Sequence, residues 1–263
     1  MILKFSQIFE NVIVCGDIHG DIMPLVFKIQ DTHKIENSII IVAGDIGIGF
    51  KKDGYYINLF KKASARLKKN NNILLFIRGN HDNPEKWLNY EPFKDFWQES
   101  DGNIRFIKDY TVIEAKTDRK EHKILCVGGA ISIDRKPNEF IATFNGESWS
   151  GRTEGKDYWS KEAFVYDESK IKDLTGITDV ITHSAPDFCE PIIKSGIEKW
   201  ILSDKELEKD CDKERKEHTL LYNKLKEKNN ISKYINGHFH FSNQNYIDGT
   251  LFKLCDIMEL YEL

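Results

Sequence analysis

The chain has 263 residues, of which 40% are hydrophobic and 30% charged, and it carries a formal net charge of −4 with neutral histidines. This balance is that of an ordinary soluble globular protein, and nothing in it singles out nucleic acid or a membrane as a partner. The length suffices for one large domain or two small ones. We expect a single domain over residues 1–263, with a loop insertion at about 132–160.

The sequence predicts neither a signal peptide nor a spanning helix. Lys4, Gln7 and Glu10 interrupt the apolar N-terminal stretch. No apolar run approaches the roughly 18 residues that a spanning helix needs. The five cysteines are scattered and form no CxxC pair, which favours reduced thiols. We therefore expect a cytoplasmic protein that does not associate with membranes.

Short β-branched runs alternate with helical patterns through the first hundred residues. The predicted strands lie at 11–15, 38–43 and 72–77, and the predicted helices and helical turns lie near 21–30, 55–69 and 84–99. We expect Asp21 to cap the first helix. Fully apolar strands that are separated by helices indicate a sheet covered on both faces.

The second half of the chain has a different pattern. The predicted elements are neighbouring strands at 104–115 and 122–131, a helix near 160–174, a strand at 179–183, a long charged helix near 203–229 and a final hairpin turned at 248–249. The stretch at about 132–160 is rich in glycine, tryptophan and charge but has neither helical nor strand periodicity. It is interpreted as a long ordered loop or a small insertion.

Five apolar strands run directly into polar, ligand-bearing motifs. These motifs are "GDIHG" after Cys15, "GD" after Ala43, "RGNHD" after Ile77, "THSAP" after Ile181 and "NGHFH" after Ile235. Ligands bind at the carboxyl ends of the strands in an open α/β sheet. We therefore expect the five motifs to converge on one site.

The converging side chains are suited to transition metals. They are Asp17, His19, Asp45, Asn80, His183, His238 and His240, besides His81. Carboxylate oxygen together with imidazole nitrogen suits Mn²⁺, Fe or Zn²⁺ and argues against a thiolate site or an all-oxygen Ca²⁺ site. One ion would use about half of this set, so the whole set suits two ions that share a bridging carboxylate. Asp17 and His19 are two residues apart, as are His238 and His240, so in extended conformation each pair would project to one side.

In this order and over residues 16–240, the motifs resemble those of the calcineurin-like metallophosphoesterases. The resemblance implies an α/β fold, a layered sandwich of two mixed β-sheets flanked by helices, with a dinuclear metal centre at the strand ends. It implies that Asp17, His19 and His240 bind one ion, that Asn80, His183 and His238 bind the other, and that Asp45 bridges them. It further implies that His81 contacts the phosphoryl group and assists departure of the leaving group, and that Asn80 also touches the phosphate.

The resemblance also implies a reaction. Two divalent ions, with Mn²⁺ as first choice and Fe or Zn²⁺ as alternatives, would activate a bridging hydroxide that attacks phosphorus in a phosphomonoester or phosphodiester. The substrate would be a small molecule, a nucleotide or a nucleic-acid end. A homo-oligomer stays open, because the charged helix near 203–229 offers a surface for one.

One motif departs from that of the Ser/Thr protein phosphatases in this family, which read GDxxDRG. Here the stretch is "GDIGIGF", with Ile48 in place of the second Asp. The residue that orients the catalytic histidine is therefore missing, and Asp82 or a main-chain carbonyl is the expected substitute for His81. A protein phosphatase is accordingly a disfavoured alternative. A non-catalytic scaffold with the same fold is a second alternative, which the complete set of ligands disfavours.

Substrate contacts are expected from the insertion. Arg135 is the first choice for a phosphate contact, with a surface salt bridge as the competing interpretation. Arg152, Trp149 and Trp159 would join it in a wall beside the metals. The lysine-rich stretch at 51–69 is interpreted as the solvated face of a helix rather than as a nucleic-acid patch, because its apolar residues recur at helical spacing.

Overall fold

The strands form two sheets within residues 1–87, 90–136, 152–189 and 197–263, which are the residues that the computed structural model describes. The first sheet has the order β12 (Leu260–Glu262), β2 (Asn11–Cys15), β3 (Ser38–Val42), β4 (Ile73–Phe76) and β5 (Ile104–Phe106). Strands β2 to β5 are parallel, and β12 pairs antiparallel to β2. The carboxyl ends of β2, β3 and β4 therefore meet at one edge of this sheet.

The second sheet is also mixed. Its order is β1 (Ile2–Phe9), β6 (Thr111–Thr117), β7 (Glu121–Val127), β8 (Asp179–Thr182), β9 (Lys233–Asn236), β11 (Thr250–Leu254) and β10 (Asn243–Ile247). The pairs β6–β7 and β10–β11 are antiparallel, whereas the other pairs are parallel. The β10–β11 hairpin turns at Asp248 and Gly249 with φ values of 50° and 79°, as its sequence predicts.

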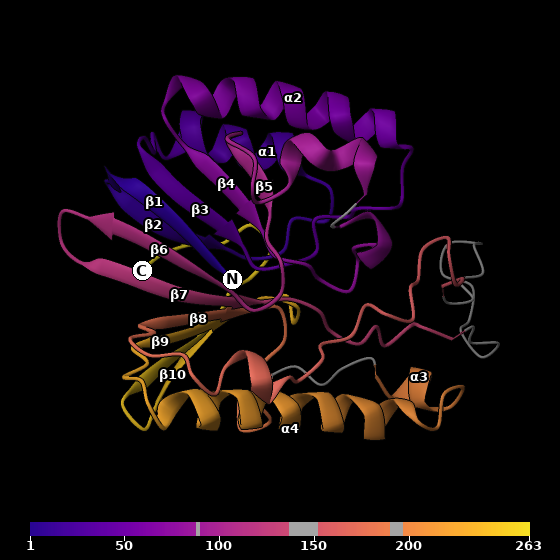
Figure 1. Cartoon of the computed structure of the whole chain (residues 1–263). Helices are drawn as coiled ribbons and strands as arrows, with labels where there is room; N and C mark the ends of the chain where they lie inside the picture. The colour runs from indigo at the N-terminus through magenta and orange to yellow at the C-terminus, as the bar shows by residue number, and fades with distance from the viewer. Residues whose placement is uncertain (88–89, 137–151, 190–196) are drawn as a thin grey trace.

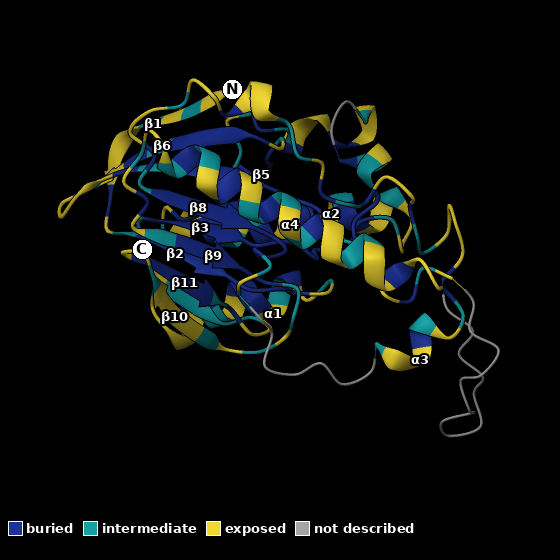
Figure 2. Cartoon of the chain, turned by 90° about the horizontal axis from the view of Figure 1, so that it is seen from below, coloured by how far each residue is buried: buried dark blue, intermediate teal, exposed yellow. Residues whose placement is uncertain are grey.

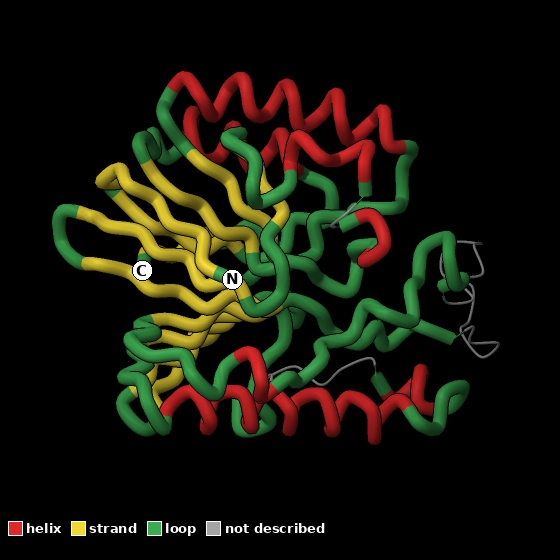
Figure 3. The backbone as a smooth tube through the Cα atoms, viewed as in Figure 1, coloured by secondary structure: helices red, strands yellow, loops and turns green. Residues whose placement is uncertain are grey.

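Helices cover the outer face of each sheet (Figure 1). Helices α1 (Ile22–Phe27) and α2 (Asp53–Lys69) lie over the first sheet, and α4 (Leu207–Lys226), preceded by the short α3 (Glu198–Ile201), lies over the second. Figure 3 shows the strands between these helices, with many of the loops gathered at one end of the sandwich. This arrangement confirms the predicted sandwich of two mixed sheets flanked by helices. None of the helices in the described part of the chain is both long and apolar enough to cross a bilayer.

The two-residue period of the strands builds the layers. In β3, Ile40 and Val42 pack against α1 and α2, whereas Ile39 and Ile41 pack against the other sheet. In β7, Leu125 faces the layer beneath α4. The fully apolar strands predicted from the sequence are thus buried on both faces.

The long charged helix occupies most of the predicted range 203–229. Its buried residues include Leu207, His218, Leu221 and Leu225, as the helical spacing predicts. Figure 2 shows α4 as alternating buried and exposed bands in front of buried strands. The lysines of this helix are exposed or half-buried, whereas Glu214 is buried.

The predicted helix near 160–174 is wrong. Only a 3₁₀ turn, Glu168–Lys170, forms there. The Arg78 guanidinium donates hydrogen bonds to the main-chain carbonyls of Lys161, Glu162 and Ala163. These carbonyls thus accept hydrogen bonds from a distant side chain, which supports an irregular backbone here.

The other short elements follow the sequence with local differences. The predicted first helix divides into α1 and a π-helical turn, Lys28–Thr32, and helical turns form at Pro84–Lys86 and Glu91–Phe96. Asp21 holds the N-cap position of α1, but its side chain makes no capping bond. Its ψ of 50° departs from the extended conformation that a capping side chain requires. The predicted strand at 104–115 divides between β5 and β6, which belong to different sheets.

The insertion is described only at its two ends. Residues 137–151 of the predicted range lie outside the described residues. Residues 132–136 and 152–160 have irregular backbone, apart from an isolated bridge between Glu154 and Tyr158. Both described ends approach the carboxyl ends of the strands, because Arg152 contacts His81 and Ser132 contacts Asn80.

Candidate metal centre

The turn after β2 meets the turn after β9. Asp17 is 1% exposed, and its carboxylate accepts hydrogen bonds from the backbone N–H of His238 at 3.0 and 3.1 Å. His240 Nε2 lies 3.1 Å from Asp17 Oδ2 and 2.9 Å from Nε2 of His19. The first and last motifs of the sequence are thus joined in space.

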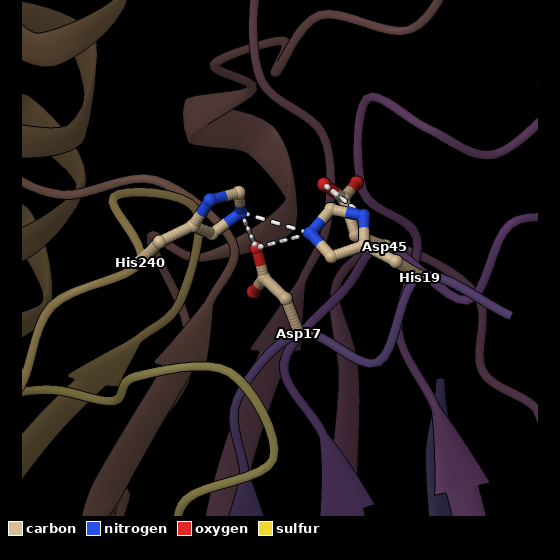
Figure 4. Close-up of side chains that lie close together, drawn as sticks. All are labelled: Asp17, His19, Asp45 and His240. Atoms are coloured by element: carbon tan, nitrogen blue, oxygen red, sulfur yellow. Dashed lines mark hydrogen bonds and ion pairs between the residues drawn. The ribbon is translucent and has the colours of Figure 1, made fainter. Parts of the chain in front are cut away.

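Asp45, which follows β3, completes this first group. The ligand atoms of Asp17, His19, Asp45 and His240 all lie within 4.8 Å of one another. In Figure 4 the Asp17 carboxylate points between the rings of His19 and His240. Two imidazole nitrogens only 2.9 Å apart must share a proton or a cation, because two lone pairs repel each other at this distance.

A second group forms around the buried His183, which follows β8. Its Nδ1 lies 2.7 Å from the carbonyl oxygen of Ala43, so Nδ1 carries the proton and donates it. Its Nε2 then faces Asn80 Oδ1 at 2.9 Å and Asp45 Oδ1 at 3.2 Å. The ring of His238 lies next to it, with the two ring centroids 4.9 Å apart.

Asp45 lies between the two groups. Its Oδ1 faces His183, whereas its Oδ2 lies 3.9 Å from His19 Nδ1. The preceding Gly44 has a φ of 110°, and a Cβ there would stand 2.1 Å from His183 Nδ1. Glycine is therefore required before Asp45, because a side chain there would collide with His183.

The paired ligands reach the site through left-handed turns rather than through extended strands. His19, His238 and His240 have φ values of 44°, 73° and 50°. The expectation that each pair projects from an extended strand is therefore wrong, because the chain has already turned where the ligands stand. Ile18 still points away from the site and into the core beneath α1.

The electrostatics of the site favour a bound cation. Burial alone would raise the pKa of Asp45, but the imidazoles of His183 and His81 outweigh it and hold that pKa well below its usual range. Burial alone would lower the pKa of His183, but Asp45 and Asp17 reverse the effect and raise it. The buried carboxylates therefore require positive charge beside them, which protons or metal ions can supply. Oxygen and nitrogen donors that face one another in this way fit divalent transition metals.

His81 lies at the edge of the centre. Its backbone N–H donates to Asp45 Oδ1 at 2.8 Å, and its Nε2 lies 2.6 Å from Arg152 Nη2. A guanidinium only donates hydrogen bonds, so Nε2 of His81 is the acceptor and its proton is on Nδ1. Burial lowers the pKa of His81 to about 4, with Arg152 acting in the same direction and Asp45 against it.

Arg152 is held by Asp134, a residue that the sequence did not point to. Arg152 Nε donates to Asp134 Oδ2 at 2.9 Å, and both side chains are buried. Arg152 Nη1 has no hydrogen-bond partner among the described residues. Asn80 gains a similar support, since its Nδ2 donates to Ser132 Oγ at 2.9 Å. Asp134 and Ser132 lie in irregular backbone, where no periodicity could have identified them.

Asp82 supports the loop that carries Asp45 rather than the His81 ring. Its carboxylate accepts hydrogen bonds from the backbone N–H groups of Gly79, Ile46 and Ile48, at 2.8, 3.1 and 2.9 Å. This buried carboxylate fixes the turn that carries Asp45. Arg152 is the side chain that is hydrogen-bonded to the His81 ring.

Other residues expected in the substrate wall lie in different surroundings. Arg135 makes ion pairs with Asp204 and Asp210, each at 2.6 Å. Its role as a phosphate contact stays a prediction. Trp159 is 4% exposed and packs against the ring of Phe50. Trp149 lies outside the described residues.

One comparison with known proteins agrees with these motifs. A family model described as calcineurin-like phosphoesterase matches residues 10–242. Among solved structures, the chain is similar to one titled "GAP50 the anchor in the inner membrane complex of Plasmodium". The identity is 14% and the TM-score 0.43, with 95% of this chain and 72% of that chain covered. No curated protein matches the chain.

Proposed function

Because the chain belongs to the calcineurin-like phosphoesterase family, we propose that it hydrolyses a phosphomonoester or phosphodiester with the help of two divalent transition-metal ions. The observation that carries this proposal is the convergence of carboxylate, imidazole and amide donors from five strand ends on one centre, with Asp17, Asp45 and His183 buried and His19 and His240 exposed. Mn²⁺ is the first choice, and Fe or Zn²⁺ are the alternatives. The substrate is a small molecule, a nucleotide or a nucleic-acid end.

We assign the ligands in two sets. Asp17, His19 and His240 hold one ion, Asn80, His183 and His238 hold the other, and Asp45 bridges them. The grouping of Asp17, His19, Asp45 and His240 within 4.8 Å supports the first set. The approach of His183 Nε2 to Asn80 and Asp45 supports the second. When bound, such ions neutralise charge on the phosphoryl oxygens and lower the pKa of water, which yields a nucleophile at neutral pH.

The chain's own residues orient the ester and stabilise the departing group. Arg152 places a guanidinium beside His81, with Nη2 on the His81 ring and Nη1 buried and unpaired among the described residues, and a planar guanidinium suits phosphoryl oxygens. His81 Nε2 lies 3.9 Å from Asp45 Oδ2 and so faces the centre, with its proton on Nδ1 while Arg152 donates to Nε2. To donate to the leaving-group oxygen, Nε2 would have to be released by Arg152 and take up a proton. Asp134 and Ser132 keep Arg152 and Asn80 in place.

The cysteines are free, which supports a cytoplasmic location.

The test combines metal analysis with hydrolysis. We expect nearly two ions per chain after loading with Mn²⁺, and turnover of an aryl phosphate or of its aryl methyl diester. Asp45→Asn should lower both metal content and kcat/KM, the latter by more than about a hundredfold. His33→Ala, which removes an exposed histidine outside the site, is the matched control and should retain both properties. A stably folded protein that binds no metal and hydrolyses neither ester would indicate a non-catalytic scaffold instead.

A further inference from the structure

A cavity of about 300 Å³ opens beside the metal centre. His19 and His81 form part of its wall, so the cavity is continuous with the place where phosphorus would lie. Its size is at the lower end of the range for small-molecule sites. Its other lining residues are not among the assigned ligands, so the space is available to the organic part of an ester.

Two exposed aromatic rings line this cavity. Phe50 is 40% exposed and Tyr55 is 51% exposed. Aromatic side chains usually bury most of their surface in the protein. Two exposed rings in the wall of one cavity therefore indicate a surface that contacts a ligand. The planes of the Phe50 ring and the His81 imidazole make an angle of 22°, and the ring centroids are 6.0 Å apart. A flat group placed against Phe50 would therefore lie close to the reacting phosphate.

The loop that carries Phe50 is held in one conformation. The buried Tyr56 hydroxyl donates to the carbonyl of Gly47 at 2.6 Å and accepts from the N–H of Lys51 at 2.9 Å. Gly49 has a φ of 115°, and a Cβ there would stand 2.7 Å from the Trp159 ring. Trp159 in turn packs edge-on against Phe50, with ring centroids 5.4 Å apart. The ring is thus preorganised, which lowers the entropy lost on binding.

The rim of the cavity is polar. Asp21 and Lys51 are both exposed and both line it. They offer an acceptor and a donor at the edge of the aromatic wall. This combination suits a planar ring with polar edges better than it suits an alkyl chain, whose edges make no hydrogen bonds.

We propose that this cavity receives an aromatic ring of the substrate's organic group, which stacks on Phe50 and Tyr55 while the phosphate lies at the metal centre. The proposal rests on the proposed phosphoesterase function and narrows it to esters of ring-bearing alcohols. A nucleoside and a simple arylmethanol share this chemistry. The stretch "GDIGIGF" has Phe50 where GDxxDRG ends in glycine, so this departure places an aromatic ring in the cavity wall.

The experiment compares esters that differ only in the ring. Adenosine 5′-monophosphate is paired with ribose 5-phosphate, and benzyl phosphate with cyclohexylmethyl phosphate; each pair is also assayed as methyl diesters. Stacking of a base on an aromatic side chain should make kcat/KM about tenfold or more higher for the ring-bearing member. Phe50→Leu and, separately, Tyr55→Leu should each reduce that ratio several-fold. Tyr246→Leu, which removes a ring that is 77% exposed on β10, is the matched control and should not change the ratio.

The outcomes separate this proposal from the function on which it rests. A preference in the adenosine pair alone identifies a nucleoside ester, and one in both pairs identifies a general aromatic group. Equal kcat/KM values within both pairs, with clear turnover, would overturn the ring site and leave the phosphoesterase intact. If no ester is hydrolysed, the proposed phosphoesterase function is wrong. The ring site is then tested by the binding of two phosphonates. In the presence of Mn²⁺, 2-phenylethylphosphonate should then bind about tenfold more tightly than 2-cyclohexylethylphosphonate, and equal affinities would overturn the proposal.

Discussion

Arg152 is the side chain through which the insertion reaches the metal centre. Its guanidinium is bound to Asp134 on one side and to His81 on the other, and its buried Nη1 has no partner within the described part of the chain. We predict that Arg152→Ala lowers kcat/KM for phosphate esters by about a hundredfold, as expected for the loss of one donor to developing charge. Metal content should stay at the wild-type value, because Arg152 is not a ligand. Steady-state kinetics together with metal analysis tests this.

Two further variants show whether the effect is specific. Asp134→Asn keeps the shape of the side chain but removes the charge that pairs with Arg152, so kcat/KM should fall by about tenfold. Arg119→Ala removes an exposed arginine that pairs with Glu262 and should retain full activity. Arg135→Ala tests the competing choice of phosphate contact. If kcat/KM falls more in Arg135→Ala than in Arg152→Ala, Arg135 rather than Arg152 would be assigned as the phosphate contact.

Among the elements, α4 carries a buried acid that makes stability depend on pH. Glu214 is 5% exposed, and burial raises its pKa from 4.5 to about 7, although hydrogen bonds from Phe164, Ser184 and Ile131 oppose the shift. Between these two pKa values the folded state holds the proton and the unfolded state has lost it. The free energy of unfolding contributed by Glu214 is therefore fully present below pH 4.5 and falls as the pH rises toward about 7.

We predict that Glu214→Gln removes this dependence. The wild type should lose up to about 1.4 kcal/mol per pH unit more than the variant across the window. Urea unfolding at pH 5 and pH 8 measures the difference. Glu208→Gln, which changes an exposed residue on the same helix, should follow the wild type. Parallel pH profiles for wild type and Glu214→Gln would contradict the prediction.

The elements also differ in how far the sequence could predict them. Strands such as β3, with five consecutive buried residues, are predictable because a continuous apolar run has one stable environment. The absence of a helix near 160–174 was not predictable, because the carbonyl of Glu162 accepts a hydrogen bond from Arg78, more than eighty residues away. Local periodicity contains no information about a distant competitor for backbone hydrogen bonds.

At the scale of the whole molecule, the same distinction divides the site. The residues of the five motifs were predictable as a group, because parallel strands end at one edge and each motif follows a strand. Asp134 and Ser132 were not, since they reach the centre from irregular backbone. The sequence did not identify Phe50 either, because its exposure depends on how Tyr56 and Trp159 hold its loop.

The centre also joins the two sheets. Asp17, Asp45 and Asn80 follow strands of the first sheet, whereas His183 and His238 follow strands of the second. Each proposed ion therefore has ligands from both sheets and would link them. Without ions, the two carboxylates, each 1% exposed, rely on protonated histidines such as His183, whose pKa they raise.

Metal removal should therefore lower the Tm of the whole fold. An ion present at a hundred times its Kd stabilises the folded state by about 2.7 kcal/mol, and for a chain of this length that corresponds to roughly 5–10 °C per site. We expect EDTA to lower the Tm of the wild type by at least this amount and Mn²⁺ to restore it. Asp45→Asn should respond much less, because its bridging ligand is gone. A wild type with two bound ions and an unchanged Tm in EDTA would contradict the link between the sheets, and full restoration by Ca²⁺ would contradict the preference of these nitrogen donors for transition metals.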